Sequence, residues 1–344
     1  MPTPIIELAG SPEDMGRQHA LSCPDAARAM VQARMDLALA TIREVNSDVD
    51  RDRCLQVAAE HLPVQEGWAP EVHAEFMALA EGLDLDPAEL FIGNGYTDYI
   101  DVLRAKVTEG AGCTSFIATG EATADGLTYV GQTWDMHAFA EPHMRIFRRR
   151  PEHGPGSVTL TTAGCLSLIG LSEAGIAIGN TNVAPTDARP GAMYLAMIHQ
   201  ALRSEGPLAA RAAITESPRA SGHYYYLADA DGRASGIETT RSRHVALDLP
   251  GGLLVHTNHY HDAGLAELSR EAAGENSLAR EQLLDGFLRP RVGGLTLEDM
   301  VAGLRLDEGS DPICRRRPDD PNAVTTCGAA IICPQRGTIW VATG

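Results

Sequence analysis

The spacing of apolar residues divides the chain into a helical first third and a strand-rich remainder. Apolar residues recur at three- and four-residue intervals over residues 11–43, 51–62 and 70–83, and the first stretch opens with the helix-start signal Ser11-Pro-Glu-Asp14. Residues 96–112 change character and end in the small run Gly110-Ala-Gly112. The pattern therefore predicts a helical segment up to about residue 95.

After residue 113 the apolar period shortens to that of β-strands. Residues 114–118 and 127–133 flank a polar connection that contains Asp125 and Gly126, which predicts a β-hairpin. Further strands are expected at 144–149, 158–162, 166–170, 175–180, 223–229, 234–238, 243–247, 253–257, 326–333 and 338–343, and helices at 192–204, 207–216, 276–288 and 296–304. Because strands and helices do not alternate strictly, the pattern favours a layered α+β sandwich over a parallel sheet.

Composition narrows the classes of protein. The 344 residues carry a formal net charge of −18, and Lys106 is the single lysine. A phosphate backbone or an anionic membrane surface needs clustered cations, so we expect neither nucleic acid nor membrane as a partner. The amino terminus lacks the ~7–15 apolar residues of a signal peptide, and no run approaches the ~20 apolar residues of a membrane span. We therefore expect a cytoplasmic protein.

One of the cysteines stands in an unusual place. The seven cysteines are scattered and never form a CxxC pair, which fits a reducing compartment rather than a disulfide framework or a zinc knuckle. Cys113 follows Gly112, and a predicted strand begins directly after it. A thiol beside the preceding carbonyl can attack it in an N-to-S acyl shift, and glycine permits the strained backbone that this shift needs. Hydrolysis of the thioester would leave Cys113 as a new amino terminus.

A free amino-terminal Cys113 would combine a nucleophile with a base. Its α-amino group has a reference pKa near ~7.7–8.0, close to the pH at which a general base works best. The predicted hairpin brings Asp135, at the end of its second strand, beside Cys113, where the carboxylate can hold the amine. Asn258, at the exit of the strand predicted at 253–257, is a candidate oxyanion donor, and Asn180 and Asn182 are weaker candidates.

The segment around Asn258 also contains residue types that bind metals. His256, His259 and His261, together with Asp262, are candidate ligands. On a continuous strand, however, residue 256 faces the opposite side from residues 259 and 261, and no HExxH pattern is present. We therefore expect no metal and no other cofactor.

Taken together, these residues resemble the acyl-coenzyme A:6-aminopenicillanic acid acyltransferase family of self-cleaving amidohydrolases. That family belongs to the amino-terminal-nucleophile hydrolases and is a relative of choloylglycine hydrolase. The similar segments follow one another along most of the chain: Asp14-Met-Gly-Arg-Gln-His19, Gly112-Cys-Thr-Ser115, Gly131-Gln-Thr-Trp-Asp135, Leu171-Ser-Glu-Ala-Gly-Ile-Ala-Ile178, His256-Thr-Asn-His259, Ile313-Cys-Arg315 and the closing strand pair.

The resemblance implies a four-layer αββα sandwich with a helical amino-terminal segment. Self-cleavage between Gly112 and Cys113 would make residues 1–112 a small subunit and residues 113–344 the catalytic large subunit, held together as a heterodimer. Cys113 would be nucleophile and base, Asp135 would orient the amine, and Asn258 would stabilise the oxyanion. The family includes hydrolases of β-alanyl amines, so the expected substrate is a small N-acyl or β-alanyl-type amide.

The sequence leaves two alternative functions and the composition of the substrate pocket undecided. The same thioester would serve an N-acyltransferase that passes the acyl group to an amine, and a catalytically silent binding homologue would keep the sandwich. Thr133 and Met136 stand where the penicillin enzyme's pattern has asparagine and an aromatic residue. We expect the substrate pocket to include Thr114, Trp134, Met136, Asn180, Tyr225 and His259. The cluster Phe139, Met144, Tyr224, Tyr225 and Tyr226 would either line an acyl pocket or belong to the core.

Overall fold

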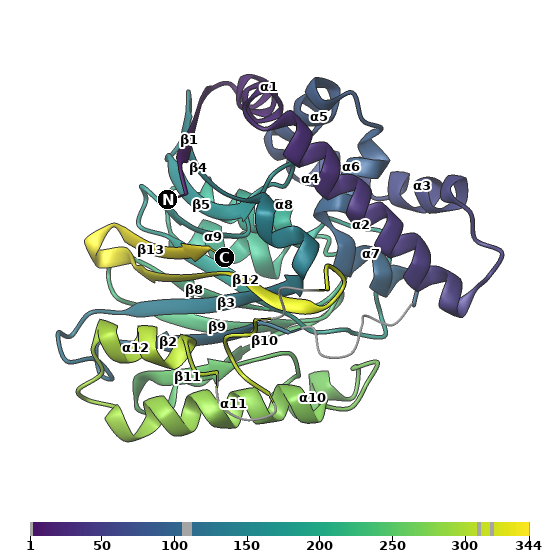
Figure 1. Cartoon of the computed structure of the whole chain (residues 1–344). Coiled ribbons are helices and arrows are strands. Elements are labelled where there is room, and N and C mark those ends of the chain that lie inside the picture. The colour runs from purple at the N-terminus through teal and green to yellow at the C-terminus, as the bar shows by residue number, and fades with distance from the viewer. Residues whose placement is uncertain (1–2, 105–111, 308–310, 317–319, 344) are drawn as a thin grey trace.

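Two β-sheets lie face to face in the computed structural model, which describes residues 3–104, 112–307, 311–316 and 320–343 (Figure 1). Among these residues the larger sheet has the strand order β1-β4-β5-β6-β7-β8-β9-β10, and the smaller sheet has the order β11-β2-β3-β12-β13. The strands are β1 Ile5–Gly10, β2 Thr114–Ala118, β3 Tyr129–His137, β4 Met144–Pro151, β5 Ser157–Thr162, β6 Ile169–Ser172, β7 Ala177–Asn182, β8 His223–Ala228, β9 Ala234–Thr239, β10 His244–Leu247, β11 Leu253–His256, β12 Val324–Cys333 and β13 Thr338–Thr343.

Helices cover the outer face of each sheet. Helix α8 packs on β6 and β7 of the larger sheet, whereas α11 packs on β11 and α12 on β12 of the smaller sheet. Because β2 and β3 contact β7 on the inner side, the layers run helix, sheet, sheet, helix, and the expected αββα sandwich is confirmed (Figure 1). The helices are α1 Pro12–Ser22, α2 Pro24–Val45, α3 Arg51–Ala59, α4 Leu62–Trp68, α5 Pro70–Leu83, α6 Pro87–Asn94, α7 Tyr96–Val102, α8 Tyr194–Leu202, α9 Pro207–Thr215, α10 Ala263–Ala266, α11 Glu275–Leu288 and α12 Leu297–Leu304, with 3-10 helices at Ala138–His143, Pro250–Gly252, Arg289–Arg291 and Pro334–Arg336.

The predicted hairpin forms the centre of the smaller sheet. Strand β2 has the predicted bounds and pairs antiparallel with β3, with Thr114 opposite Thr133. Every residue of β2 and of β3 is buried, because one face of this sheet meets the larger sheet and the other meets helices and loops. Strand β3 continues to His137, so Asp135 lies inside the strand rather than at its end.

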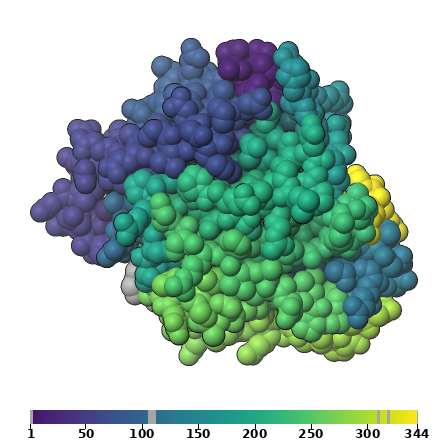
Figure 2. Space-filling model, turned by 180° about the vertical axis from the view of Figure 1, so that it is seen from behind, coloured from purple at the N-terminus to yellow at the C-terminus, as the bar shows by residue number. Residues whose placement is uncertain are grey.

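Residues 1–112 are not helical throughout, which corrects the prediction in two places. The segment Ile5–Gly10 forms β1, which pairs in parallel with β4 at the edge of the larger sheet, and Tyr96–Val102 adds the helix α7 after the predicted end. Strand β1 depends on pairing with a distant strand, so its local pattern carries no sign of it. Buried side chains of this segment, including Met15 and Phe76, share one continuous core with the sandwich. Figure 2 shows the purple and blue first third lying across one side of the body.

None of the helices in the described ranges combines the length and the apolar character needed to cross a bilayer. All seven cysteines are free thiols; Cys314 is partly exposed, and the other six are buried.

Candidate active site

Gly112 and Cys113 lie in the wall of a cleft of about 900 Å³, directly before β2. The cleft is lined by residues of both sheets, by α7 and by the segments around residues 258–280, 311–316 and 320–324. Among the lining residues are Thr97, Trp134, Asp135, Met136, Asn180, Asn182, Asn258, His259, Arg280 and Arg315. The structure therefore brings Cys113, Asp135 and Asn258 to one cleft, together with four of the six expected pocket residues.

The other two expected pocket residues, Thr114 and Tyr225, do not line this cleft. Thr114 is fully buried, and its Oγ1 accepts a hydrogen bond from Arg280 at 2.9 Å. The Tyr225 hydroxyl lies 3.8 Å from Met197 Sδ, on the side of β8 that faces α8. Phe139, Met144, Tyr224 and Tyr226 are also absent from the cleft wall. The tyrosines of β8 belong to the core, because helices cover one face of that strand and the smaller sheet covers the other.

The Cys113 thiol is buried beside a carboxylate. Burial raises its pKa to about 12, and the charge of Asp135 acts in the same direction. A hydrogen bond with the main chain of Asp135 and the charges of Arg280 and Arg315 oppose this rise. The thiol is therefore protonated at neutral pH, so its attack on a carbonyl would require a base.

Asp135 has one satisfied and one unsatisfied oxygen. Its Oδ1 accepts a hydrogen bond from Thr326 Oγ1 at 2.7 Å, and a β-bulge at residue 327 sets Thr326 opposite Asp135. Its Oδ2 is buried without a hydrogen-bond partner among the described residues, and Arg315 Nε lies 3.9 Å away. Burial raises the pKa of Asp135 to about 6, although the charges of Arg280 and Arg315 and the hydrogen bond from Thr326 lower it. A carboxylate oxygen in this state is ready to accept a proton or a new donor.

Arg280, which the sequence analysis missed, connects these residues. Its Nη1 donates to the Cys113 carbonyl oxygen at 2.6 Å, and its Nη2 donates to Asn258 Oδ1 at 2.9 Å. Burial lowers its pKa to about 10, with the charge of Asp135 opposing, so the guanidinium stays charged at neutral pH. A signal did exist: Arg280 occupies the buried face of α11 together with Ser277, Leu284 and Leu288. An arginine within an apolar helix stripe is rarely buried without a partner.

Asn258 and Gly112 are packed against each other. An ideally placed Cβ at Gly112 would lie 2.3 Å from Asn258 Oδ1 and 2.3 Å from Arg280 Nη2. A side chain at residue 112 would therefore displace the ends of the Asn258 and Arg280 side chains. Asn258 Nδ2 donates to Asn182 O at 2.9 Å, and the Asn258 main-chain N–H donates to Ser277 Oγ at 2.9 Å. The side-chain amide is thereby fixed beside the Gly112–Cys113 bond.

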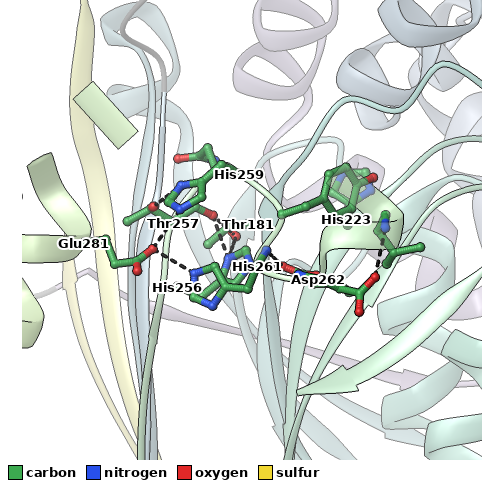
Figure 3. A network of polar contacts seen from close by, with 12 residues as sticks. Thr181, His223, His256, Thr257, His259, His261, Asp262 and Glu281 are labelled. Carbon is green, nitrogen blue, oxygen red and sulfur yellow. Dashed lines mark hydrogen bonds and ion pairs between the residues drawn. The ribbon is translucent and has the colours of Figure 1, made fainter. Parts of the chain in front are cut away.

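The three histidines around Asn258 converge, which corrects the expectation that residue 256 faces away from residues 259 and 261. Strand β11 ends at His256 and the chain then turns, so the ring centroids of His256 and His261 lie 4.6 Å apart and those of His259 and His261 lie 5.3 Å apart (Figure 3). Asp262 caps α10 by accepting from Leu265 N at 2.9 Å. The carboxylates that face the rings are Glu238 and Glu281, which the sequence analysis did not single out.

Comparison with known proteins gives one family match. Residues 122–344 match the model of the family described as acyl-coenzyme A:6-aminopenicillanic acid acyl-transferase. An uncharacterized protein of Archaeoglobus fulgidus is 24% identical over 341 residues, which cover 86% of this chain, and the chain spans about 56% of the length of that relative.

Two solved enzyme structures are similar to part of this chain, at low sequence identity. Penicillin V acylase from Agrobacterium tumefaciens has 16% identity and a TM-score of 0.44, over 67% of this chain and 83% of that one. A variant of conjugated bile acid hydrolase from Clostridium perfringens has 13% identity and a TM-score of 0.45, over 67% of this chain and 89% of that one.

Proposed function

The chain belongs to the acyl-coenzyme A:6-aminopenicillanic acid acyl-transferase family, and from this premise we propose that it is a self-processing cysteine amidohydrolase. Cleavage before Cys113 divides it into a small subunit, residues 1–112, and a large subunit, residues 113–344. The new amino terminus then hydrolyses a small N-acyl or β-alanyl-type amide through a thioester. The observation that carries the proposal is the position of the Gly112–Cys113 bond, which lies in a cleft wall together with Asp135, Asn258 and Arg280.

The first step is cleavage of the chain's own backbone. Cys113 Sγ attacks the carbonyl carbon of Gly112 while the thiol proton passes to Asp135, whose pKa of about 6 leaves it ionised at neutral pH. The carbon–nitrogen bond breaks as the nitrogen gains a proton, which leaves a thioester and a free α-amine on Cys113. Water then hydrolyses the thioester to the Gly112 carboxylate and the thiol. Arg280 holds the Cys113 carbonyl in place throughout this step.

The second step is turnover of a substrate amide. The α-amine of Cys113, with a reference pKa near ~7.7–8.0, takes the thiol proton. Its ammonium form supplies the unsatisfied Oδ2 of Asp135 with a charged hydrogen-bond donor. The thiolate attacks the substrate carbonyl, and as the carbon–nitrogen bond breaks the Cys113 ammonium gives its proton to the departing substrate amine. Water, deprotonated by the Cys113 α-amine, then hydrolyses the acyl-thioester to the free acid and the thiol. Asn258 Nδ2 donates one amide hydrogen to Asn182 O, and in this proposal its second amide hydrogen stabilises the oxyanion.

The cleft favours a small polar substrate. Its volume of about 900 Å³ falls in the ~300–1,000 Å³ range of small-molecule sites. Charged side chains of both signs line it: Arg270, Glu271, Glu275, Asp311, Arg316 and Asp320. Such a wall suits a polar amide, such as a β-alanyl amine, better than a long apolar acyl chain.

Acyl transfer is the second candidate function, because the matching family model is described as an acyl-transferase. The same acyl-thioester would react with an amine instead of water. Product analysis with processed protein, an acyl donor and an excess of acceptor amine distinguishes the two, since transfer gives a new amide and hydrolysis gives the free acid.

Denaturing electrophoresis of purified protein tests the proposal. Wild type should give two bands of about 12 and 25 kDa, the shares of the 36.7 kDa chain on either side of the cut. Cys113→Ala should remain a single chain, and Cys113→Ser should cut slowly because a hydroxyl is a poorer nucleophile at neutral pH. Cys54→Ala, which removes another buried thiol, is the matched control and should be processed normally.

A Cys113→Ala chain that is still cut between residues 112 and 113 would contradict the proposed cleavage mechanism. If processing is confirmed, the cut protein should be screened against N-acyl amines, β-alanyl amines and β-lactams, with Cys113→Ala as the inactive reference. Activity of that variant equal to wild type would show that the chemistry lies elsewhere.

A further inference from the structure

Three histidines and two glutamates gather where the chain turns from β11 toward α11 (Figure 3). Within this cluster, Nε2 of His259 and Nε2 of His261 lie 3.2 Å and 2.8 Å from the same atom, Oε2 of Glu281. The ligand atoms of these three residues all lie within 4.8 Å of one another. Their side chains are 10%, 24% and 25% exposed, so an ion from solution has access to them.

Contacts behind this set hold it in position. His259 Nδ1 lies 2.9 Å from Ser277 Oγ, which leaves Nε2 facing Glu281. Glu238 accepts hydrogen bonds from the main-chain N–H groups of His261 at 2.6 Å and Asp262 at 3.0 Å, and these bonds fix the turn that carries His261. In metal sites, a ligand histidine typically forms a hydrogen bond through its second ring nitrogen, and this bond orients the ring toward the ion.

A second set, Glu238, His256 and His261, also has its ligand atoms within 4.8 Å of one another. Glu238 and His256 are fully buried and lie 2.8 Å apart, and Tyr224 stacks on the His256 ring at 3.7 Å between centroids. Glu238 already has three donors. This pair therefore supports the turn from behind, and the accessible set is the better binding site.

From this geometry we propose that His259, His261 and Glu281 bind one divalent transition-metal ion, with Zn²⁺ as the expected occupant. Two imidazoles and one carboxylate form a donor set that suits Zn²⁺ and leaves a fourth position for water. Ca²⁺ and Mg²⁺ prefer oxygen ligands alone, so they should bind weakly here.

The ion would connect two segments that hold the proposed active site. Asn258 stands directly before His259 in the turn, and Arg280 stands directly before Glu281 in α11. Binding at this point would lock the turn against α11 and so fix the positions of Asn258 and Arg280 around Gly112. The ion takes no part in the acyl chemistry, and its binding does not depend on self-cleavage of the chain.

Titration of the full-length protein with metal alone tests the proposal. After treatment with a chelator and dialysis, wild type should bind one equivalent of Zn²⁺ by calorimetry, and Zn²⁺ should raise its melting temperature because the ion binds only the folded state. Co²⁺ should give visible d–d bands without a thiolate-to-cobalt charge-transfer band, since the three ligands include no cysteine.

Matched variants identify the ligands. His261→Ala and Glu281→Gln should each weaken binding by roughly 100-fold or more, since loss of even an outer-shell partner costs ~10–100-fold. The controls are His153→Ala, which removes an exposed histidine far along the chain, and Cys113→Ala, which removes a thiol of the same cleft that His259 lines. Both should bind Zn²⁺ as wild type does.

Two results would overturn the proposal: no binding by wild type, or an unchanged Co²⁺ spectrum in the His261→Ala/Glu281→Gln double variant. Circular dichroism without metal verifies that each variant folds. Should His261→Ala fail this check, Glu281→Gln decides alone, because it keeps the size of the side chain. Loss of the Co²⁺ bands then supports the site, and their retention refutes it.

Discussion

Replacing Gly112 by alanine places a methyl group where the structure has no room for one. Its ideal Cβ would lie 2.3 Å from both Arg280 Nη2 and Asn258 Oδ1, and 3.1 Å from Arg280 Cζ. Real Cβ atoms essentially never approach other heavy atoms closer than 3.0 Å, so these two side-chain ends must shift by about 0.7 Å. The shift has a cost because hydrogen bonds hold both ends: Arg280 donates to Cys113 O and Thr114 Oγ1, and Asn258 donates to Asn182 O. This shift would lengthen the 2.6 Å hydrogen bond that Arg280 donates to the Cys113 carbonyl oxygen.

The size of the effect follows from this overlap. Overpacking of a buried site costs ~1–3 kcal/mol, and the hydrogen bond from a charged donor contributes ~1.5–3 kcal/mol. Overpacking is present before cleavage as well, so the slowing comes from the displaced Arg280 hydrogen bond, which positions the Cys113 carbonyl in the transition state. Each ~1.4 kcal/mol lost there slows the reaction tenfold, so Gly112→Ala should be processed roughly 10- to 100-fold more slowly than wild type.

Cell-free synthesis followed by denaturing electrophoresis at intervals measures this rate. Gly67→Ala is the matched control, because a Cβ at Gly67 meets no atom within 4 Å. A small subunit that carries the Gly112→Ala substitution at its last residue, paired with a large subunit produced with Cys113 as its first residue, should hydrolyse substrate almost normally, since the crowded peptide bond is absent. Processing of Gly112→Ala at the wild-type rate would refute the steric argument, and equal slowing of Gly67→Ala would do so as well.

The remaining predictions concern turnover, pH and assembly. Asn258→Ala should lower kcat by ~10²–10³ with little change in KM, the cost of one lost oxyanion donor; near-normal turnover would transfer that role to Asn180. Self-cleavage should slow as the pH falls through about 6, because Asp135 is then protonated and cannot take the thiol proton; Asp135→Asn should be slow at every pH, and a flat wild-type profile would contradict this base. Size-exclusion chromatography of processed protein should recover both pieces in one fraction, because each large apolar side chain in the shared core contributes ~1.5–3 kcal/mol against an association cost of ~4–15 kcal/mol; separate elution would contradict the heterodimer.

Local signals made much of the fold predictable. Helix α5 begins at Pro70 and ends at Leu83 as predicted, and β2 has its predicted bounds, since the helix-start proline and the apolar period are properties of the segment itself. Strand β1 was not predictable in this way, because its six residues become a strand only by pairing with β4. Helix α7 was missed because its buried polar residues Asp98 and Asp101 hide the apolar period.

For the candidate site, too, only the contacts set by local pairing could be predicted. The register of the hairpin alone brings Asp135 close to Cys113, so their proximity followed from the sequence. Arg280 reaches the site through the docking of α11: its place in the apolar stripe of that helix indicates burial, but not which residues it contacts. Thr326 reaches the site through a β-bulge at residue 327, which has no local signature. The prediction that His256 faces away from His259 and His261 was wrong because β11 ends at His256. The segment His256-Thr-Asn-His259 contains no glycine or proline to mark that end.

Strand β1 joins residues 1–112 to the rest of the chain at the edge of the larger sheet. Within the described residues, β1 is the one strand of that sheet that comes from residues 1–112, and it lies beside β4. Without it, the backbone N–H and C=O groups of β4 that pair with β1 would form an open edge, which is a template for pairing with other chains. If the chain is cut before Cys113 as proposed, residues 1–112 would protect this edge of the large subunit by strand complementation. Residues 113–344 produced alone should aggregate, and co-production with residues 1–112 should restore solubility, whereas residues 11–112 should not.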